Sequence, residues 1–77
     1  MINSFFSGNK IKEIRLKNGL TQSELARKAN INPKILSYWE VGTKIPTNLK
    51  ILNVLASVLN CTLQDFTEIE LYRNIVY

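Results

Sequence analysis

The sequence predicts an all-α domain, a compact bundle of about five short helices with an apolar C-terminal tail. Apolar residues recur at helical spacing along most of the chain, and signals for helix starts and stops separate the segments. Strand signals are absent until the two chain ends, and the tail suits either a strand or a helix. The 77 residues are enough for one domain, near the lower size that folds without disulfides or metals.

The first two helices are bounded by recognisable capping signals. We expect the first over residues 8–18, because Gly19 is a natural left-handed terminator. The second is expected over residues 22–29. At its start Thr21 can cap the helix and Glu24 can close a capping box, since the two residues are three positions apart.

The third helix is expected over residues 33–40, where Asn32 can act as the N-cap and Pro33 suits the first helical position. A fourth is expected over residues 48–59 and a short fifth over residues 62–66. The second and third helices are brief and joined by a tight turn. Two helices joined in this way form the unit that places one helix in the DNA major groove.

Charge is distributed unevenly along the chain, whose net charge is +4. Residues 1–50 carry nine Lys or Arg against three Glu, whereas residues 51–77 carry one Arg against three acidic residues. The basic part contains the two-helix unit, so a polyanionic partner fits that part of the chain. A basic face that is merely solvated is the alternative.

Several function classes are not expected. A single cysteine excludes an intramolecular disulfide, and without histidine a zinc site is not expected. The chain lacks a glycine-rich phosphate loop and carboxylates paired for acid–base work, so we expect no enzyme, no cofactor and no small-molecule substrate. No window approaches the roughly 20 apolar residues that span a bilayer, and the N-terminus lacks the parts of a secretion signal. We therefore expect a cytoplasmic protein without membrane attachment.

Polar, apolar and glycine positions follow one another in the order and spacing of a known family. In chain order they are Ile11, Ile14, Arg15, Gly19, Leu20, Thr21, Gln22, Glu24, Leu25, Ala26, Ile31, Leu36, Trp39, Glu40, Gly42, Pro46, Leu49, Leu52, Leu55, Ala56 and Leu59. This pattern resembles the helix-turn-helix domain of phage repressors and Cro proteins, the Xre-like family. The resemblance implies a lambda-repressor-like bundle that binds operator DNA, commonly as a dimer, and it implies a bacterial or phage origin.

The resemblance divides the chain into three parts. Residues 9–67 are expected to form the helix-turn-helix DNA-binding domain. Residues 1–8 precede it as an N-terminal arm, and residues 68–77 follow it as a C-terminal tail that is a candidate dimerisation segment.

The third helix would be the recognition helix. Its residues expected to contact bases are Asn32, Lys34, Ser37 and Tyr38. Lys34 could donate to guanine O6 and N7, and Tyr38 could contact a thymine methyl group or bond a phosphate. The alternatives are a solvated lysine and a tyrosine that packs on the helix rim. Pro33 replaces the polar residue usual in the family, so only apolar contact with a base methyl group remains there.

Residues expected to contact phosphates lie at the start of the second helix and after the third. They are Gln22, Thr43, Lys44, Thr47 and Asn48. Gln22 would sit in the first turn of its helix, where unpaired backbone amides attract anions, and the family resemblance implies a phosphate contact there. The alternative is a plain exposed residue. The resemblance also implies a structural ion pair between Arg15 and Glu40, linking the first helix to the end of the third.

A second apolar stripe marks the fourth helix. Ile51, Val54 and Val58 fall at i, i+3 and i+7, outside the expected inward stripe, and must be covered by something. The apolar tail, with Leu71 and Ile75, is one candidate. Either the chain ends fold back onto their own domain, or the stripe and tail form a homodimer interface.

The sequence therefore predicts a sequence-specific regulator of transcription. We expect a repressor that binds a palindromic operator in double-stranded DNA as a homodimer, with a regulatory protein as a candidate further partner. The alternative is an antitoxin-like or adaptor protein that uses the stripe and the tail to bind another polypeptide.

Overall fold

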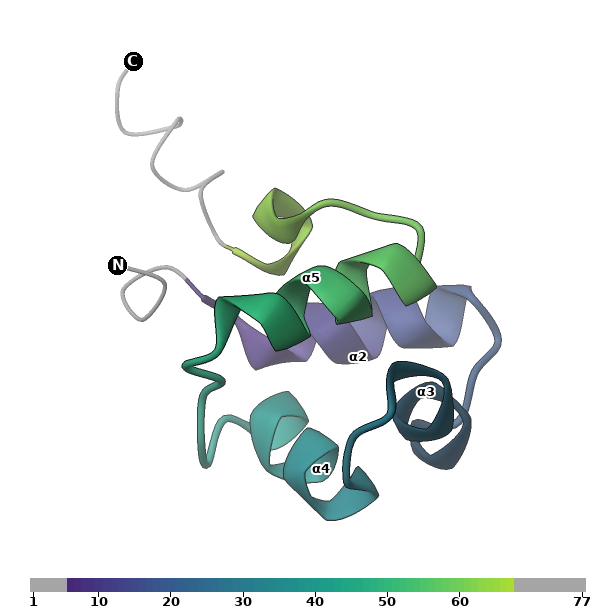
Figure 1. Ribbon diagram of the computed structural model, residues 1–77, viewed down its shortest axis with the longest axis horizontal. Coiled ribbons are helices and arrows are strands. Elements are labelled where there is room, and N and C mark those ends of the chain that lie inside the picture. The colour runs from purple at the N-terminus through teal and green to yellow at the C-terminus, as the bar shows by residue number, and fades with distance from the viewer. Residues whose placement is uncertain (1–5, 68–77) are drawn as a thin grey trace.

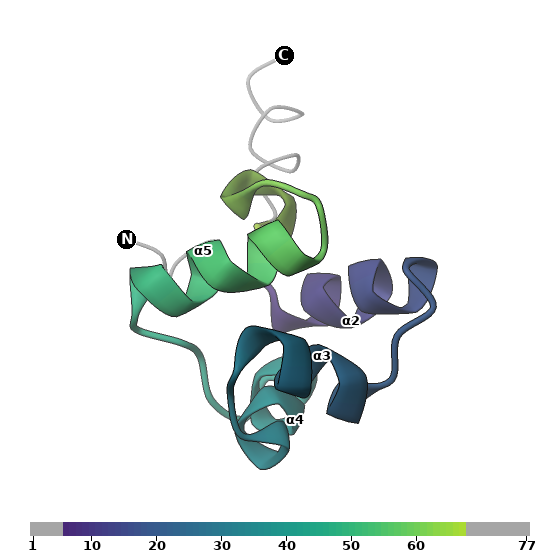
Figure 2. The same cartoon turned by 45° about the vertical axis from the view of Figure 1, so that its right-hand side comes forward.

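The computed structural model describes residues 6–67, which form four α-helices followed by one 3₁₀ helix. In chain order they are α2 (Gly8–Lys17), α3 (Gln22–Ala29), α4 (Pro33–Val41), α5 (Leu49–Val58) and η1 (Leu63–Phe66). Helices α3 and α4 lie on one side of α2 and α5, and η1 lies on the other side (Figures 1 and 2). The predicted all-α bundle is confirmed.

Each end of the four α-helices lies within one residue of its predicted position. Helix α2 ends at Lys17 and α4 continues to Val41. Asn48 lies just before α5 as its N-cap, where its side chain accepts a hydrogen bond from the Lys50 amide at 2.8 Å. The predicted fifth helix is a single 3₁₀ segment, which is the usual form of so short a helix.

Side-chain caps explain why α3 begins where it does. The Thr21 hydroxyl accepts a hydrogen bond from the Glu24 amide at 3.0 Å, and the Glu24 carboxylate accepts one from the Thr21 amide at 2.8 Å. This reciprocal arrangement is the predicted capping box. Gly19, in the turn before α3, has a φ of +71°, a left-handed value that favours glycine.

The core is built from one face of each helix. Its buried apolar side chains are Ile11, Leu25, Ala26, Ala29, Leu36, Trp39, Leu52, Leu55, Ala56, Leu59 and Phe66. Gly8, at the start of α2, lies against the backbone of α4, and a Cβ atom there would overlap the carbonyl oxygen of Trp39. The absence of a side chain at Gly8 therefore sets how closely α2 approaches α4.

The two ends of the described segment lie beside each other. Phe6 and Thr67 form an isolated antiparallel bridge, and the Ser7 amide donates to the Phe66 carbonyl oxygen at 2.7 Å. Most of the predicted arm and all of the predicted tail, including Leu71 and Ile75, lie outside the described residues. Among residues 6–67, none of the helices is long and apolar enough to cross a membrane.

Candidate nucleic-acid interface

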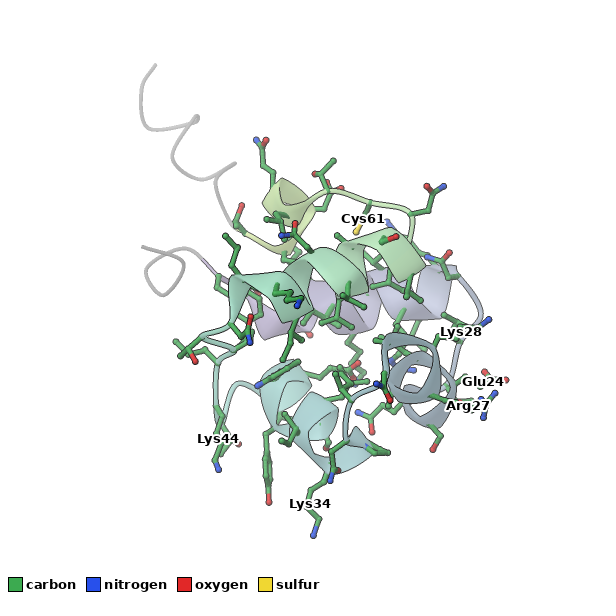
Figure 3. The ribbon with its side chains drawn as sticks, viewed as in Figure 1. Glu24, Arg27, Lys28, Lys34, Lys44 and Cys61 are labelled. Carbon is green, nitrogen blue, oxygen red and sulfur yellow. The ribbon has the colours of Figure 1, made fainter. Side chains whose placement is uncertain are left out.

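Helix α4 has a buried face and an outward face. Leu36, Trp39 and Glu40 are buried against the bundle. On the outward side Lys34 is exposed, and Ser37 and Tyr38 are half-buried. The Lys34 side chain extends away from the bundle (Figure 3). The structure thus places three of the four residues predicted to contact bases on the side of α4 that faces away from the core, with Lys34 exposed and Ser37 and Tyr38 partly covered.

The fourth predicted base-contact residue, Asn32, has part of its hydrogen-bonding capacity in use. Its Oδ1 accepts a hydrogen bond from the Lys34 amide at 2.8 Å, which makes Asn32 the N-cap of α4. Its Nδ2 group can donate to a base edge, and its Oδ1 keeps one further lone pair. Asn48 has the same limit, since its Oδ1 caps α5.

A basic loop follows α4 and packs against its last turn. The ammonium nitrogen of Lys44 lies 5.1 Å from the ring centroid of Tyr38, within the range of a cation–π contact. The amide of Thr43 donates to the Tyr38 carbonyl oxygen at 3.0 Å, which ties the loop to the helix. Lys34 and Lys44 extend on the same side of the molecule (Figure 3). Thr43, Lys44 and Thr47 are all exposed, so the loop offers donors to a polyanion.

Behind the outward face, Arg15 and Glu40 form a two-point ion pair. Arg15 Nε donates to Glu40 Oε2 at 2.8 Å and Arg15 Nη2 donates to Oε1 at 3.0 Å. Arg15 Nη1 also donates to the carbonyl oxygen of Leu20 at 2.8 Å. Both side chains are almost fully buried, so the pair connects α2, the turn before α3 and the end of α4.

Gln22 is a third member of this network, which the sequence did not indicate. Its Nε2 donates to Glu40 Oε1 at 2.9 Å, so the side chain is held in place from within the fold. The Gln22 side-chain amide has a second N–H, and Gln22 is the first residue of α3, where a backbone amide has no partner within the helix. The predicted phosphate-contact residue is therefore held by a buried carboxylate. No local pattern links positions 22 and 40.

The predicted interface stripe on α5 is only partly exposed. Val54 is 38% exposed, whereas Ile51 and Val58 are half-buried and pack against the core of their own domain. Leu49, at the start of the same helix, is 50% exposed. Part of the stripe is thus covered by the bundle itself.

A groove of about 610 Å³ lies elsewhere, between α2 and the segment that carries η1. It shares no residue with the predicted DNA-contact set. Among the described residues no group of three or more His, Cys, Asp or Glu side chains could hold a metal ion.

Comparison with known proteins decides the family. A helix-turn-helix family model matches residues 11–66. The chain belongs to this helix-turn-helix family. Among solved structures, SinR, a master regulator for biofilm formation, in complex with DNA is similar to the chain at 30% sequence identity and a TM-score of 0.71. That match covers 74% of this chain and 90% of SinR in that structure.

A second similar structure is a complex of SinR with SinI, matched at 24% identity and a TM-score of 0.75, over 90% of this chain and 73% of that one. A search of curated proteins found no match. These neighbours show the predicted lambda-repressor-like fold, and together with the family match they support a DNA-binding regulator of transcription.

Proposed function

We propose that the protein is a repressor that binds a palindromic operator in double-stranded DNA as a homodimer. One observation carries the proposal: the side of α4 that faces away from the core carries Lys34, Ser37 and Tyr38, while its other side is anchored by Leu36 and Trp39. A helix held rigidly from behind can enter the major groove without changing its own position. Such a protein acts in the cytoplasm, by occluding promoter DNA, and needs no cofactor or catalytic step.

The side chains divide between positioning and sequence recognition. Phosphate contacts fix the register of a protein on DNA, and contacts to base edges select the sequence. We assign the first role to Gln22 and to the loop residues Thr43, Lys44, Thr47 and Asn48. We assign the second role to Lys34, Ser37 and Tyr38, and to Asn32, whose Oδ1 already accepts one hydrogen bond and whose Nδ2 can donate. Lys34 is suited to guanine, whose O6 and N7 are the acceptors in the major groove.

Twofold symmetry is proposed because one small domain contacts few bases. A single module of this size buries about 600–1,000 Å² on DNA. Two copies related by a twofold axis would place their recognition helices about 34 Å apart, in successive major grooves. The stripe on α5 that contains Val54, with the half-buried Ile51 and Val58 beside it, is the proposed contact between the copies.

Selection of bound sites from a random DNA pool tests the proposal. We expect an enriched inverted repeat. Lys34→Ala should lower the affinity for that repeat by about 5- to 150-fold at fixed salt, which is the range of one good base contact. Lys12→Ala is the matched control, since it removes the same charge from an exposed position on α2. An unenriched pool, or equal losses in the two variants, would contradict the proposal.

A regulatory protein is the second partner that we propose. SinR was solved both with DNA and with SinI, and this chain leaves apolar side chains exposed on α5. If protein binding were the main activity, as in an antitoxin-like or adaptor protein, the DNA pool would stay unenriched. The same selection therefore separates the two functions.

A further inference from the structure

We infer that the first turn of α4 recognises thymine methyl groups, and that Pro33 and Ile35 are specificity-determining residues. The inference rests on the proposed function and adds the class of base that the helix selects.

The start of α4 has few groups that can hydrogen-bond to bases. In a helix-turn-helix protein the residues at the N-terminal end of the recognition helix contact the base edges. Here those residues are Asn32, Pro33, Lys34 and Ile35. Asn32 Oδ1 is occupied by the cap, and Pro33 and Ile35 have no polar side-chain atoms. Only the Lys34 ammonium group and Asn32 Nδ2 can donate, and the one side-chain acceptor in this turn, Asn32 Oδ1, already accepts the Lys34 amide.

The same turn exposes apolar surface on both sides of Lys34. Pro33 is exposed and Ile35 is 43% exposed, although neither belongs to the core cluster. Among the groups that base pairs present in the major groove, the C5 methyl of thymine is the apolar one. Apolar side chains that enter the groove therefore contribute most to the binding affinity where they contact a thymine methyl group. The geometry favours a half-site with thymines flanking the base that Lys34 contacts.

Replacing thymine by uracil tests this directly, because it removes the methyl group and keeps the base pairing. The probe is the inverted repeat recovered by selection, with each thymine of the half-site changed to uracil in turn. Burying one methyl group is worth about fourfold in affinity. We expect the wild-type protein to lose about fourfold at one or two positions in each half-site.

Variants of α4 show whether the protein contacts the methyl group. Pro33→Ala with Ile35→Ala should bind the thymine and uracil operators equally, since the apolar contact is already gone. Val41→Ala is the matched control: Val41 is 71% exposed but lies at the opposite end of α4. For this variant, the ratio of the affinities for the thymine and uracil operators should equal that of the wild-type protein.

Each result separates the inference from the proposed function. If the wild-type protein binds the selected repeat specifically but binds its uracil versions equally well, the methyl recognition is wrong and the operator function stands. A loss that persists in the Pro33→Ala, Ile35→Ala variant would also overturn the inference, because the methyl group would then act through DNA shape. If the pool yields no repeat, the proposed function itself fails.

Discussion

At the scale of single residues, Glu40 is the group that links the helices of the proposed interface. Its carboxylate is almost fully buried and accepts hydrogen bonds from Arg15 Nε, Arg15 Nη2 and Gln22 Nε2. Burial of a charge is costly unless it is paired. Here the two Arg15 bonds join α2 to the end of α4, and the Gln22 bond joins α3 to the end of α4. Glu40 thus stabilises the bundle and fixes Gln22 at the proposed phosphate contact.

We expect Glu40→Gln to lower the free energy of unfolding by about 3–5 kcal/mol, because Arg15 would keep a buried charge without its partner. Urea denaturation measures the change. The double variant Arg15→Met, Glu40→Leu should recover most of the loss, since apolar residues of similar volume can replace a buried ion pair. Equal stability of the wild type and Glu40→Gln would show that the pair contributes nothing.

Glu24 links stability to pH. The hydrogen bond from the Thr21 amide is the main cause that lowers the pKa of the Glu24 carboxyl below its usual value of 4.5. A carboxylate with a lowered pKa in the folded state stabilises the fold above its unfolded pKa. This contribution is lost as the pH falls through the folded pKa. The capping box should therefore weaken in acid, below about pH 4.5.

Glu24→Gln should reduce the difference in Tm between pH 7 and pH 3, because the variant has no proton to gain at this position. Thermal unfolding followed by circular dichroism measures the difference. Glu13→Gln, at an exposed position within α2, is the control. If the two variants show the same difference between pH 7 and pH 3, Glu24 does not carry the effect.

At the scale of helices, the sequence predicted the helix boundaries, because these are set by hydrogen bonds between residues close together in the chain. The caps at Thr21 and Asn32 bound α3 and α4, and each cap bonds to an amide two or three residues away. The Gln22–Glu40 bond joins positions 18 residues apart, so only the assembled fold reveals it. Likewise, the sequence marks Gly8 only as the start of a helix. The structure shows that Gly8 lets the backbone of α4 approach α2 closely.

Gly8→Ala tests how closely α2 and α4 must approach. Alanine favours the helix by up to about 1 kcal/mol, but its Cβ would overlap the Trp39 carbonyl oxygen, which belongs to the backbone and cannot rotate away. Overpacking of this kind costs about 1–3 kcal/mol. We expect a net destabilisation in urea denaturation. Asn9→Ala, one residue along at an exposed position, should not destabilise the protein; equal behaviour of the two variants would contradict the close contact.

At the scale of the whole molecule, the two proposed contact surfaces lie on different elements. The side chains proposed to contact bases lie on α4 and at its N-cap, whereas Val54, at the proposed contact between copies, belongs to α5. The bridge between Phe6 and Thr67 holds the two ends of the described segment beside each other. A copy docked on α5 would therefore leave α4 free for DNA, as a dimeric repressor requires.

Val54→Glu tests that arrangement. Val54 is 38% exposed, so the variant should fold, and a charge on each copy should repel its symmetry-related partner across a twofold contact. We expect sedimentation to show a monomer. The affinity for the inverted repeat should fall by about a hundredfold, because each half-site would then bind one copy independently. Asn53→Glu places the same charge at the neighbouring exposed position and should leave both properties unchanged. A Val54→Glu protein that sediments as the wild type does would exclude α5 as the dimer contact, while leaving recognition of one half-site by α4 intact.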